Sequence, residues 1–247
     1  YEIGMRDWSS DVCSSDLDAY KWEQAKPAAG LPLTRPSEIG LKVRRLGLQD
    51  YVPLWQAMRY LAEHPRQGRD DEIWMLSHKP VFTQGQAGRA EHILDAGDIP
   101  IVHIDRGGQV TYHGPGQLVG YLLIDVKRRK MGVRELVDLI EEAIVEALAT
   151  FDIRGERRAD APGVYVNGAK IAALGLRIKN GLSYHGLSLN VDMDKSPFDR
   201  INPCGFEDLR VTQVADLIGP VDAERNLMQE VSSALVAALL PRFGYRT

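Results

Sequence analysis

Seven short runs of strand-forming residues, interrupted by one long amphipathic helix, constrain the fold of this chain more than any other sequence feature. Within residues 134–148, apolar side chains recur at helical spacing on a single stripe, made of Leu136, Val137, Ile140, Ala143, Ile144 and Ala147. Other helical patterns cover residues 51–62, 211–218 and 226–240. The runs that favour strands are residues 41–47, 72–78, 99–105, 117–126, 163–166, 170–178 and 184–191. Because strands and helices do not alternate regularly, the order predicts an α/β chain of mixed α+β type rather than a doubly wound sheet.

Composition narrows the possible classes of protein. The chain has 247 residues, of which 44% are hydrophobic and 26% charged, so one large globular domain is expected. Its formal net charge of -4 gives no reason to expect nucleic-acid binding. There is no apolar run long enough to cross a membrane and no secretion signal, so we expect a cytoplasmic protein with no membrane partner. The two cysteines, Cys13 and Cys204, lie far apart, which argues against a disulfide framework and a structural zinc site.

The N-terminal segment differs in character from the rest of the chain. Residues 1–40 show no convincing amphipathic period, and we interpret them as disordered or extraneous. Within them, residues 1–17 contain RDWSSDVCSSDL, which resembles translated sequencing-adapter sequence. We therefore exclude Cys13 from functional argument and expect the catalytic domain to comprise residues 41–247.

Residues 106–117, RGGQVTYHGPGQ, concentrate glycines, an arginine and a histidine between two strand candidates. Such composition is typical of a loop whose backbone approaches a ligand closely. A glycine-rich hairpin with an incidental histidine is the alternative. The segment lacks both the phosphate-loop pattern and the dinucleotide-binding pattern, so a nucleotide cradle is not favoured.

A lysine follows a predicted tight turn. Asn167 and Gly168 lie between two strand candidates and predict a hairpin, after which Lys170 begins its strand. A solvated surface charge is the ordinary interpretation of such a lysine. However, the neighbours of Lys170 are small and apolar, and a lysine in such surroundings can lose its proton more readily and act in catalysis.

The sequence RINPCGFEDL places Cys204 between a proline and a glycine, which predicts a loop that substrate could reach. An inert, buried cysteine is the alternative. A catalytic thiol needs an activating group, because only a small fraction of an ordinary thiol is ionised at neutral pH. His113 and His185 are alternative bases, although a single histidine is more often structural.

Taken together, RGGQVTYHGPGQ, GAKIAALGLRI, YHGLSLNV and INPCG closely resemble the lipoate-protein octanoyltransferase family, in this order and at these separations. The resemblance extends upstream through DEIWMLSHKPVFTQGQAG and covers essentially residues 40–240. It implies the biotin/lipoate protein ligase-like fold, a mixed β-sheet flanked by helices. It also implies an acyltransferase that moves an octanoyl group onto a lysine of a lipoyl domain through an acyl-cysteine thioester, with no ATP or metal.

The resemblance implies a role for particular residues. Cys204 would be the nucleophile, and Lys170 would activate it and manage protons. The substrate pocket would be lined by Arg106, Gly107, Gly108, Gln109, Val110, Thr111, Tyr112, His113, Ala173, Leu174, Gly175, Gly186, Leu187 and Ser188.

The implied partners are proteins. Octanoyl-acyl carrier protein would be the donor, and the acceptors would be lipoyl domains of 2-oxoacid dehydrogenases and the glycine cleavage H protein. Because such carriers are typically acidic, candidate docking charges are Lys127, Arg128, Arg129, Lys130, Arg154, Arg157 and Arg158. Ordinary solvated charge is the alternative for all of them.

Three other functions fit parts of the pattern. An ATP-dependent lipoate or biotin ligase would share the fold but would not need Cys204. A thiol hydrolase would let water attack the acyl-cysteine. A non-catalytic binding module would keep the fold and lose the chemistry, which the presence of both Lys170 and Cys204 disfavours.

Overall fold

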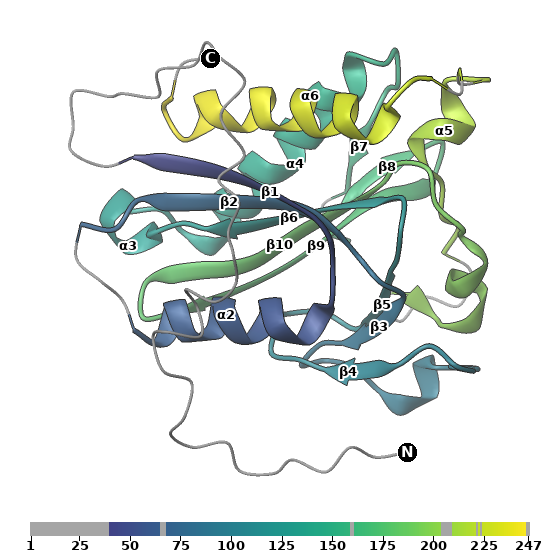
Figure 1. Ribbon diagram of the computed structural model, residues 1–247, viewed down its shortest axis with the longest axis horizontal. Helices are drawn as coiled ribbons and strands as arrows, with labels where there is room; N and C mark the ends of the chain where they lie inside the picture. The colour runs from purple at the N-terminus through teal and green to yellow at the C-terminus, as the bar shows by residue number, and fades with distance from the viewer. Residues whose placement is uncertain are drawn as a thin grey trace.

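A mixed seven-stranded sheet forms the centre of the computed structural model, which describes residues 40–64, 68–158, 161–203, 209–220, 222 and 224–245 (Figure 1). Its strand order is β1-β2-β6-β10-β9-β8-β7, and β1 pairs with β2 in parallel while the other neighbours are antiparallel. The strands are β1 (Leu41–Gln49), β2 (Asp71–His78), β6 (Gln117–Leu123), β7 (Glu156–Arg157), β8 (Val164–Val166), β9 (Ala169–Lys179) and β10 (Leu182–Asn190). The predicted N-terminal segment, with Cys13, lies outside the described residues, and so does Cys204.

A smaller sheet lies beside the large one. Its order is β4-β3-β5, with β3 (Val81–Gln84) parallel to β4 (Ile101–His103) and antiparallel to β5 (Val110–His113). The interpretation of residues 106–117 as one loop is therefore wrong, because four of these residues form the buried strand β5. The short strand β3 was not predicted, since its four residues VFTQ are too few to show a period.

Helices cover both faces of the large sheet (Figure 1). Helices α4 (Val133–Ala149) and α6 (Leu227–Arg242) pack together on one face, and α2 (Tyr51–Glu63) lies on the other. The predicted stripe of the long helix is mostly buried in the core beneath α4, including Leu136, Ile140 and Ile144 at 0% exposure. The mixed sheet flanked by helices confirms the predicted fold class.

Short helices complete the described part of the chain: α3 (Val126–Arg129), α5 (Val214–Leu217) and the 3₁₀ turns Ala90–His92 and Ser196–Arg200. The helix expected over residues 211–218 is thus reduced to α5, because Val211 instead forms a bridge with Lys170. None of the helices in the described ranges is long and apolar enough to span a membrane.

A buried carboxylate ties α3 to the sheet and to the C-terminal end. Asp71 on β2 is 1% exposed and pairs with Arg128 at 2.7 Å and with Arg129 at 2.6 Å. Arg129 also donates to the backbone carbonyl of Phe243 at 3.0 Å. Arg128 and Arg129 are therefore structural, which corrects their interpretation as docking charges.

Replacing Asp71 with Asn should lower the free energy of unfolding by about 3–5 kcal/mol, because it leaves two partly buried guanidinium groups without their shared carboxylate. Chemical denaturation would measure the change. Replacing the exposed Asp98 with Asn should shift the same quantity by less than about 0.5 kcal/mol. Equal effects of the two substitutions would show that the Asp71 cluster does not hold the fold together.

Candidate active site

The β9–β10 hairpin presents a row of small residues on the face of the sheet that α2 covers. In the antiparallel register Ser188 pairs with Ala173, and Gly186 pairs with Gly175. Paired residues project on the same face of a sheet, so these four positions form a shallow floor. Above this floor lies a cavity of about 490 Å³, open mouth included, which we call the inner cavity.

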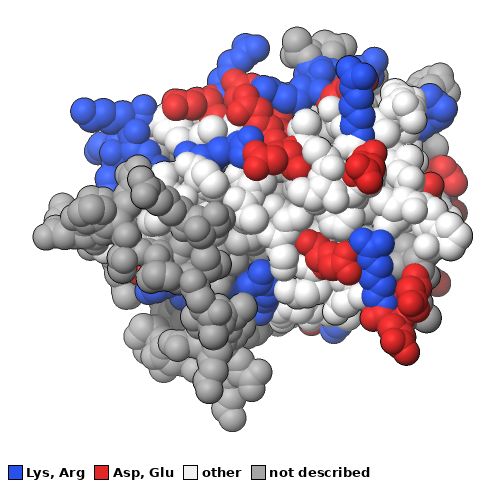
Figure 2. Space-filling model, turned by 90° about the horizontal axis from the view of Figure 1, so that it is seen from above, with Lys and Arg blue, Asp and Glu red and all other residues white. Residues whose placement is uncertain are grey.

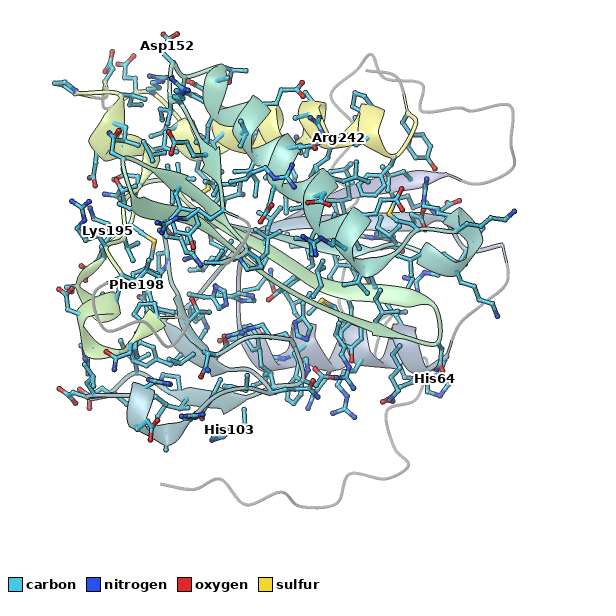
Figure 3. The ribbon with its side chains drawn as sticks, turned by 180° about the vertical axis from the view of Figure 1, so that it is seen from behind. His64, His103, Asp152, Lys195, Phe198 and Arg242 are labelled. Carbon is cyan, nitrogen blue, oxygen red and sulfur yellow. The ribbon has the colours of Figure 1, made fainter. Side chains whose placement is uncertain are left out.

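A second cavity adjoins the first and contains Lys170. It encloses about 310 Å³ with its mouth, and we call it the lysine cavity. Thr111, Ala173 and Ser188 line both cavities, so the two are adjacent. Phe198, which also lines the lysine cavity, lies at the edge of the small sheet (Figure 3), where its ring contacts that of Tyr112 with centroids 5.6 Å apart.

Lys170 reaches the lysine cavity because of the turn before it. Asn167 and Gly168 both have left-handed backbones, with φ of 50° and 79°, as a two-residue hairpin turn between β8 and β9 requires. The side chain of Lys170 is 6% exposed, so the interpretation as a solvated surface charge is wrong. Its Nζ donates to the carbonyl of Pro162 at 3.2 Å and lies 5.2 Å from the ring centre of Tyr165.

The loop that holds Lys170 is itself fixed by a buried carboxylate from α4. Glu141, 4% exposed, accepts a hydrogen bond from the backbone N–H of Gly163 at 2.7 Å and one from Arg157 at 2.9 Å. A side chain at Gly163 would not fit, since a Cβ there would lie 2.6 Å from the carbonyl oxygen of Ala172 and 3.1 Å from Cε of Lys170. The contacts of Lys170 therefore depend on a glycine at position 163.

The segment that carries Cys204 is anchored on both sides of residues 204–208, which lie outside the described ranges. Upstream, the N–H of Asn202 donates to the carbonyl of His92 at 2.8 Å. Downstream, the residues around Val211 pair with Lys170, whose N–H donates to the carbonyl of Arg210 at 2.8 Å. Pro203 and Leu209, which bracket the five residues, both line the lysine cavity. The chain thus enters and leaves the Cys204 segment beside Lys170.

Arg106 anchors the glycine-rich segment to the small sheet. Its guanidinium is buried and donates to the carbonyl and the hydroxyl of Thr83, at 2.8 and 2.9 Å, and to the carbonyl of Gly107 at 2.8 Å. A Cβ at Gly175 would lie 2.9 Å from Cδ of Arg106, so this glycine lets the arginine cross the hairpin closely. Arg106 thus acts as a wall of the inner cavity as well as a brace.

Hydrogen bonds through the side-chain amides of Gln117 and Asn190 hold the ring of His113 in place. Gln117 accepts from Nδ1 of His113 at 2.7 Å and donates to Asn190 at 2.9 Å. Burial, reinforced by the neighbouring His78, lowers the pKa of His113 to about 3, so this ring is neutral at physiological pH. Burial also lowers the pKa of His185, against the opposing effect of Asp105. Both rings line the inner cavity, and neither lines the lysine cavity beside Pro203 and Leu209.

Most of the residues predicted to line a substrate pocket lie together. All of them except Gly107 and Tyr112 line the inner cavity. Within the described ranges, no cluster of three or more His, Cys, Asp or Glu side chains could hold a metal ion.

Comparison with known proteins identifies the family. The family described as the lipoyl protein ligase A/B catalytic domain matches residues 50–240. The octanoyltransferase of Stutzerimonas stutzeri is 58% identical over 203 residues, which are 82% of this chain and 90% of the relative. That of Azotobacter vinelandii is 59% identical over 204 residues, 82% of this chain and 91% of the relative. This chain belongs to the octanoyltransferase family.

The solved structure of a bipartite lipoate protein ligase from Thermoplasma acidophilum has the same fold as this octanoyltransferase-family chain. The TM-score is 0.65 at 17% identity, over 83% of this chain and 84% of the ligase chain. The predicted family and the predicted ligase-like fold are therefore both confirmed.

Sequence reasoning missed several side chains of the inner cavity. Tyr51 and Tyr121 line it, as does Val119. Tyr121 donates to Nε2 of His78 at 2.6 Å, which orients its hydroxyl at the cavity wall. Alternation along residues 117–126 could have grouped Val119 with Tyr121, but Tyr51 begins a helix that reaches the cavity only through tertiary packing.

In this octanoyltransferase-family chain, replacing Gly163 with Ala should lower the rate of octanoyl transfer to a lipoyl domain by about 10–100-fold, because the new methyl group displaces Lys170. Steady-state assays with matched thermal unfolding would separate this effect from loss of fold. Gly132→Ala is the control, since nothing lies within 4 Å of a Cβ at that position. A folded Gly163→Ala variant with the wild-type rate would show that the position of Lys170 is not critical.

Proposed function

We propose that this octanoyltransferase-family protein carries the octanoyl group on Cys204, taking it from octanoyl-acyl carrier protein and giving it to a lysine of a lipoyl domain, with Lys170 as the proton carrier. The observation behind the proposal is the adjacency of the two cavities. Lys170 lies at one end, beside the residues that bracket Cys204, and an apolar-walled cavity extends from there. The relatives that are 58% and 59% identical to this chain are named octanoyltransferases, which supports the octanoyl-transfer part of the proposal.

The first step exchanges one thioester for another. Cys204, after giving its proton to Lys170, attacks the carbonyl carbon of the donor thioester, and a tetrahedral oxyanion forms. The bond to the carrier's sulfur then breaks, and the leaving thiolate takes a proton from the Lys170 ammonium. The octanoyl group is left on Cys204, and the two thioesters are close in free energy.

The second step forms an amide. The neutral amine of the acceptor lysine attacks the acyl-cysteine, its surplus proton passes to Lys170, and the Cys204 sulfur leaves. Because an amide is more stable than a thioester, this step is downhill. No ATP is required, and neither a metal nor another cofactor has a role in either step.

The inner cavity suits a hydrocarbon tail. Its walls include the apolar side chains of Val110, Val119, Leu174 and Leu187, while the glycines of the hairpin let the chain lie close to the backbone. Water is displaced from these walls when the tail enters, which favours binding and also protects the acyl-cysteine from hydrolysis.

Exposed basic residues close to Lys170 in the fold or the sequence are the proposed docking residues for acidic carrier and lipoyl domains. The guanidinium of Arg158 lies 4.9 Å from the ring centre of Tyr165, and the same ring contacts Lys170. Arg154 is exposed and lies four residues before Arg158 in the sequence. Basic and acidic side chains both occur on the face that carries α6 (Figure 2). Arg157 pairs with Asp138, Glu141 and Glu142, so much of its charge is already compensated. Lys127 and Lys130 lie on or next to α3, near the Gly181 turn at the far end of β10.

The acceptors would be the lipoyl domains of 2-oxoacid dehydrogenases and the glycine cleavage H protein. In the proposed reaction the acceptor lysine of each domain enters the lysine cavity as a neutral amine. Attraction between the basic docking residues and an acidic lipoyl domain would raise the association rate of the two proteins more than their binding affinity.

Intact mass spectrometry should detect an octanoyl adduct on Cys204 when the protein is mixed with octanoyl-acyl carrier protein. Adding a lipoyl domain without ATP should then move that mass onto the domain. Cys204→Ser should form no thioester, and Lys170→Met should form the adduct far more slowly, because neither proton transfer is then assisted.

Three outcomes would contradict the proposal. Transfer that occurs only with free octanoate and ATP would indicate a ligase. Release of free octanoate from the adduct in the presence of a lipoyl domain would indicate a hydrolase. Full transfer by Cys204→Ser would show that the cysteine is not the carrier.

A further inference from the structure

His185 has an unusual backbone within β10. Its φ is 60°, in the left-handed region that non-glycine residues rarely adopt inside a strand. In a regular strand His185 would project to the face opposite Tyr184 and Gly186. The left-handed backbone instead brings its ring to the cavity face, where it stacks on Tyr184 with centroids 4.9 Å apart and lines the inner cavity. Local strain of this kind is often retained at functional positions.

Asp105 locks the ring in place. The Nε2 of His185 donates to Asp105 at 3.1 Å, and the same carboxylate accepts from Nε1 of Trp55 at 2.8 Å and from the hydroxyl of Tyr184. Burial opposes ionisation of Asp105, yet these three donors together hold its pKa well below the usual range. Nδ1 of His185 is buried and has no hydrogen-bond partner in the part of the chain that the structure describes. The ring therefore presents a fixed, polar wall.

The ladder of β10 places this wall at the end of the inner cavity away from Lys170. Ser188 lies where the two cavities meet, Gly186 follows, and His185 comes next along the strand. Three residues of a strand span about 10 Å. The seven carbon–carbon bonds of an extended octanoyl chain span about 9 Å.

We propose that His185, held by Asp105, is the end wall of the inner cavity and limits the bound acyl chain to about eight carbons. The inference rests on the proposed function and assigns to it a specificity-determining residue. A longer chain would have to push the ring away from Asp105, breaking its hydrogen bond to this partly buried carboxylate. The rings of Tyr184 and Tyr121 and the Asp105 carboxylate all contact the His185 ring, so it cannot move without breaking these contacts.

The direct test removes the ring without straining the backbone. Glycine tolerates positive φ, so His185→Gly should keep the turn of the strand while extending the cavity. The control is Asn180→Gly, which also replaces a left-handed residue, with φ of 51°, in the same hairpin. Asn180 is far from the lysine cavity. It donates to the carbonyl of Ala62 near the end of α2, and His64, two residues further on, lies on the opposite side of the molecule from Phe198, which lines that cavity (Figure 3).

Each protein would be mixed with equal amounts of octanoyl-, decanoyl- and dodecanoyl-acyl carrier protein, and the adducts on Cys204 would be read by intact mass. In His185→Gly the ratio of dodecanoyl to octanoyl adduct should rise at least about tenfold over wild type, since several more methylene groups can be buried. Asp105→Asn should raise it less, and Asn180→Gly should leave it unchanged.

The outcomes separate this inference from the proposed function. If wild type forms the octanoyl adduct but His185→Gly keeps the wild-type ratio, the end wall is not His185 and the proposed function stands. If wild type forms no adduct with any donor, the proposed function fails first. Should His185→Gly not fold, His185→Asn replaces it, because asparagine also tolerates positive φ and is shorter than histidine. An unchanged ratio in that variant would equally overturn the inference.

Discussion

Burial of the Lys170 amino group is the constraint on which the rest of the site depends. An amino group removed from water needs polar contacts, and here they include the Pro162 carbonyl and the face of the Tyr165 ring. Glu141 supports these contacts, because it accepts a hydrogen bond from the N–H of Gly163 in the loop that carries Pro162. A carboxylate on a helix of one face thus helps to set the position of the Lys170 amino group, which we propose to be the proton carrier. The buried hydrogen bond between Glu141 and Gly163 thus connects helix α4 to the loop that contacts Lys170.

The same hairpin that presents Lys170 also forms the floor of the inner cavity. Small residues at Ala173, Gly175 and Gly186 leave room above β9 and β10, and the small sheet and α2 close that space. Lys170 and the apolar walls of the inner cavity therefore lie along the same β9–β10 hairpin. This arrangement fits a transferase, which must hold an acyl chain between two partner proteins, and it explains why the glycines occur in this stretch.

Local sequence patterns predicted the parts of the structure that depend on local physics. The Asn167-Gly168 turn requires positive φ at both positions, and the helix over residues 134–148 repeats its apolar stripe for four turns, so both were predictable. The brace at Glu141 and the left-handed His185 arise from contacts between distant segments, which no local pattern records. Strands β3 and β5, of four residues each, are too short to show a period. The role of Cys204 came from family resemblance, since one cysteine in a loop has no diagnostic spacing.

The most direct test of the pairing between Lys170 and Cys204 is the pH dependence of the alkylation rate of Cys204. Mass spectrometry of the peptide that contains Cys204 would measure this rate. If Lys170 activates the thiol, wild type should reach half-maximal rate about 1–3 pH units below Lys170→Met, because a nearby ammonium favours the thiolate. Identical profiles for the two proteins would show that Lys170 does not act on Cys204, and the proposed mechanism would be wrong.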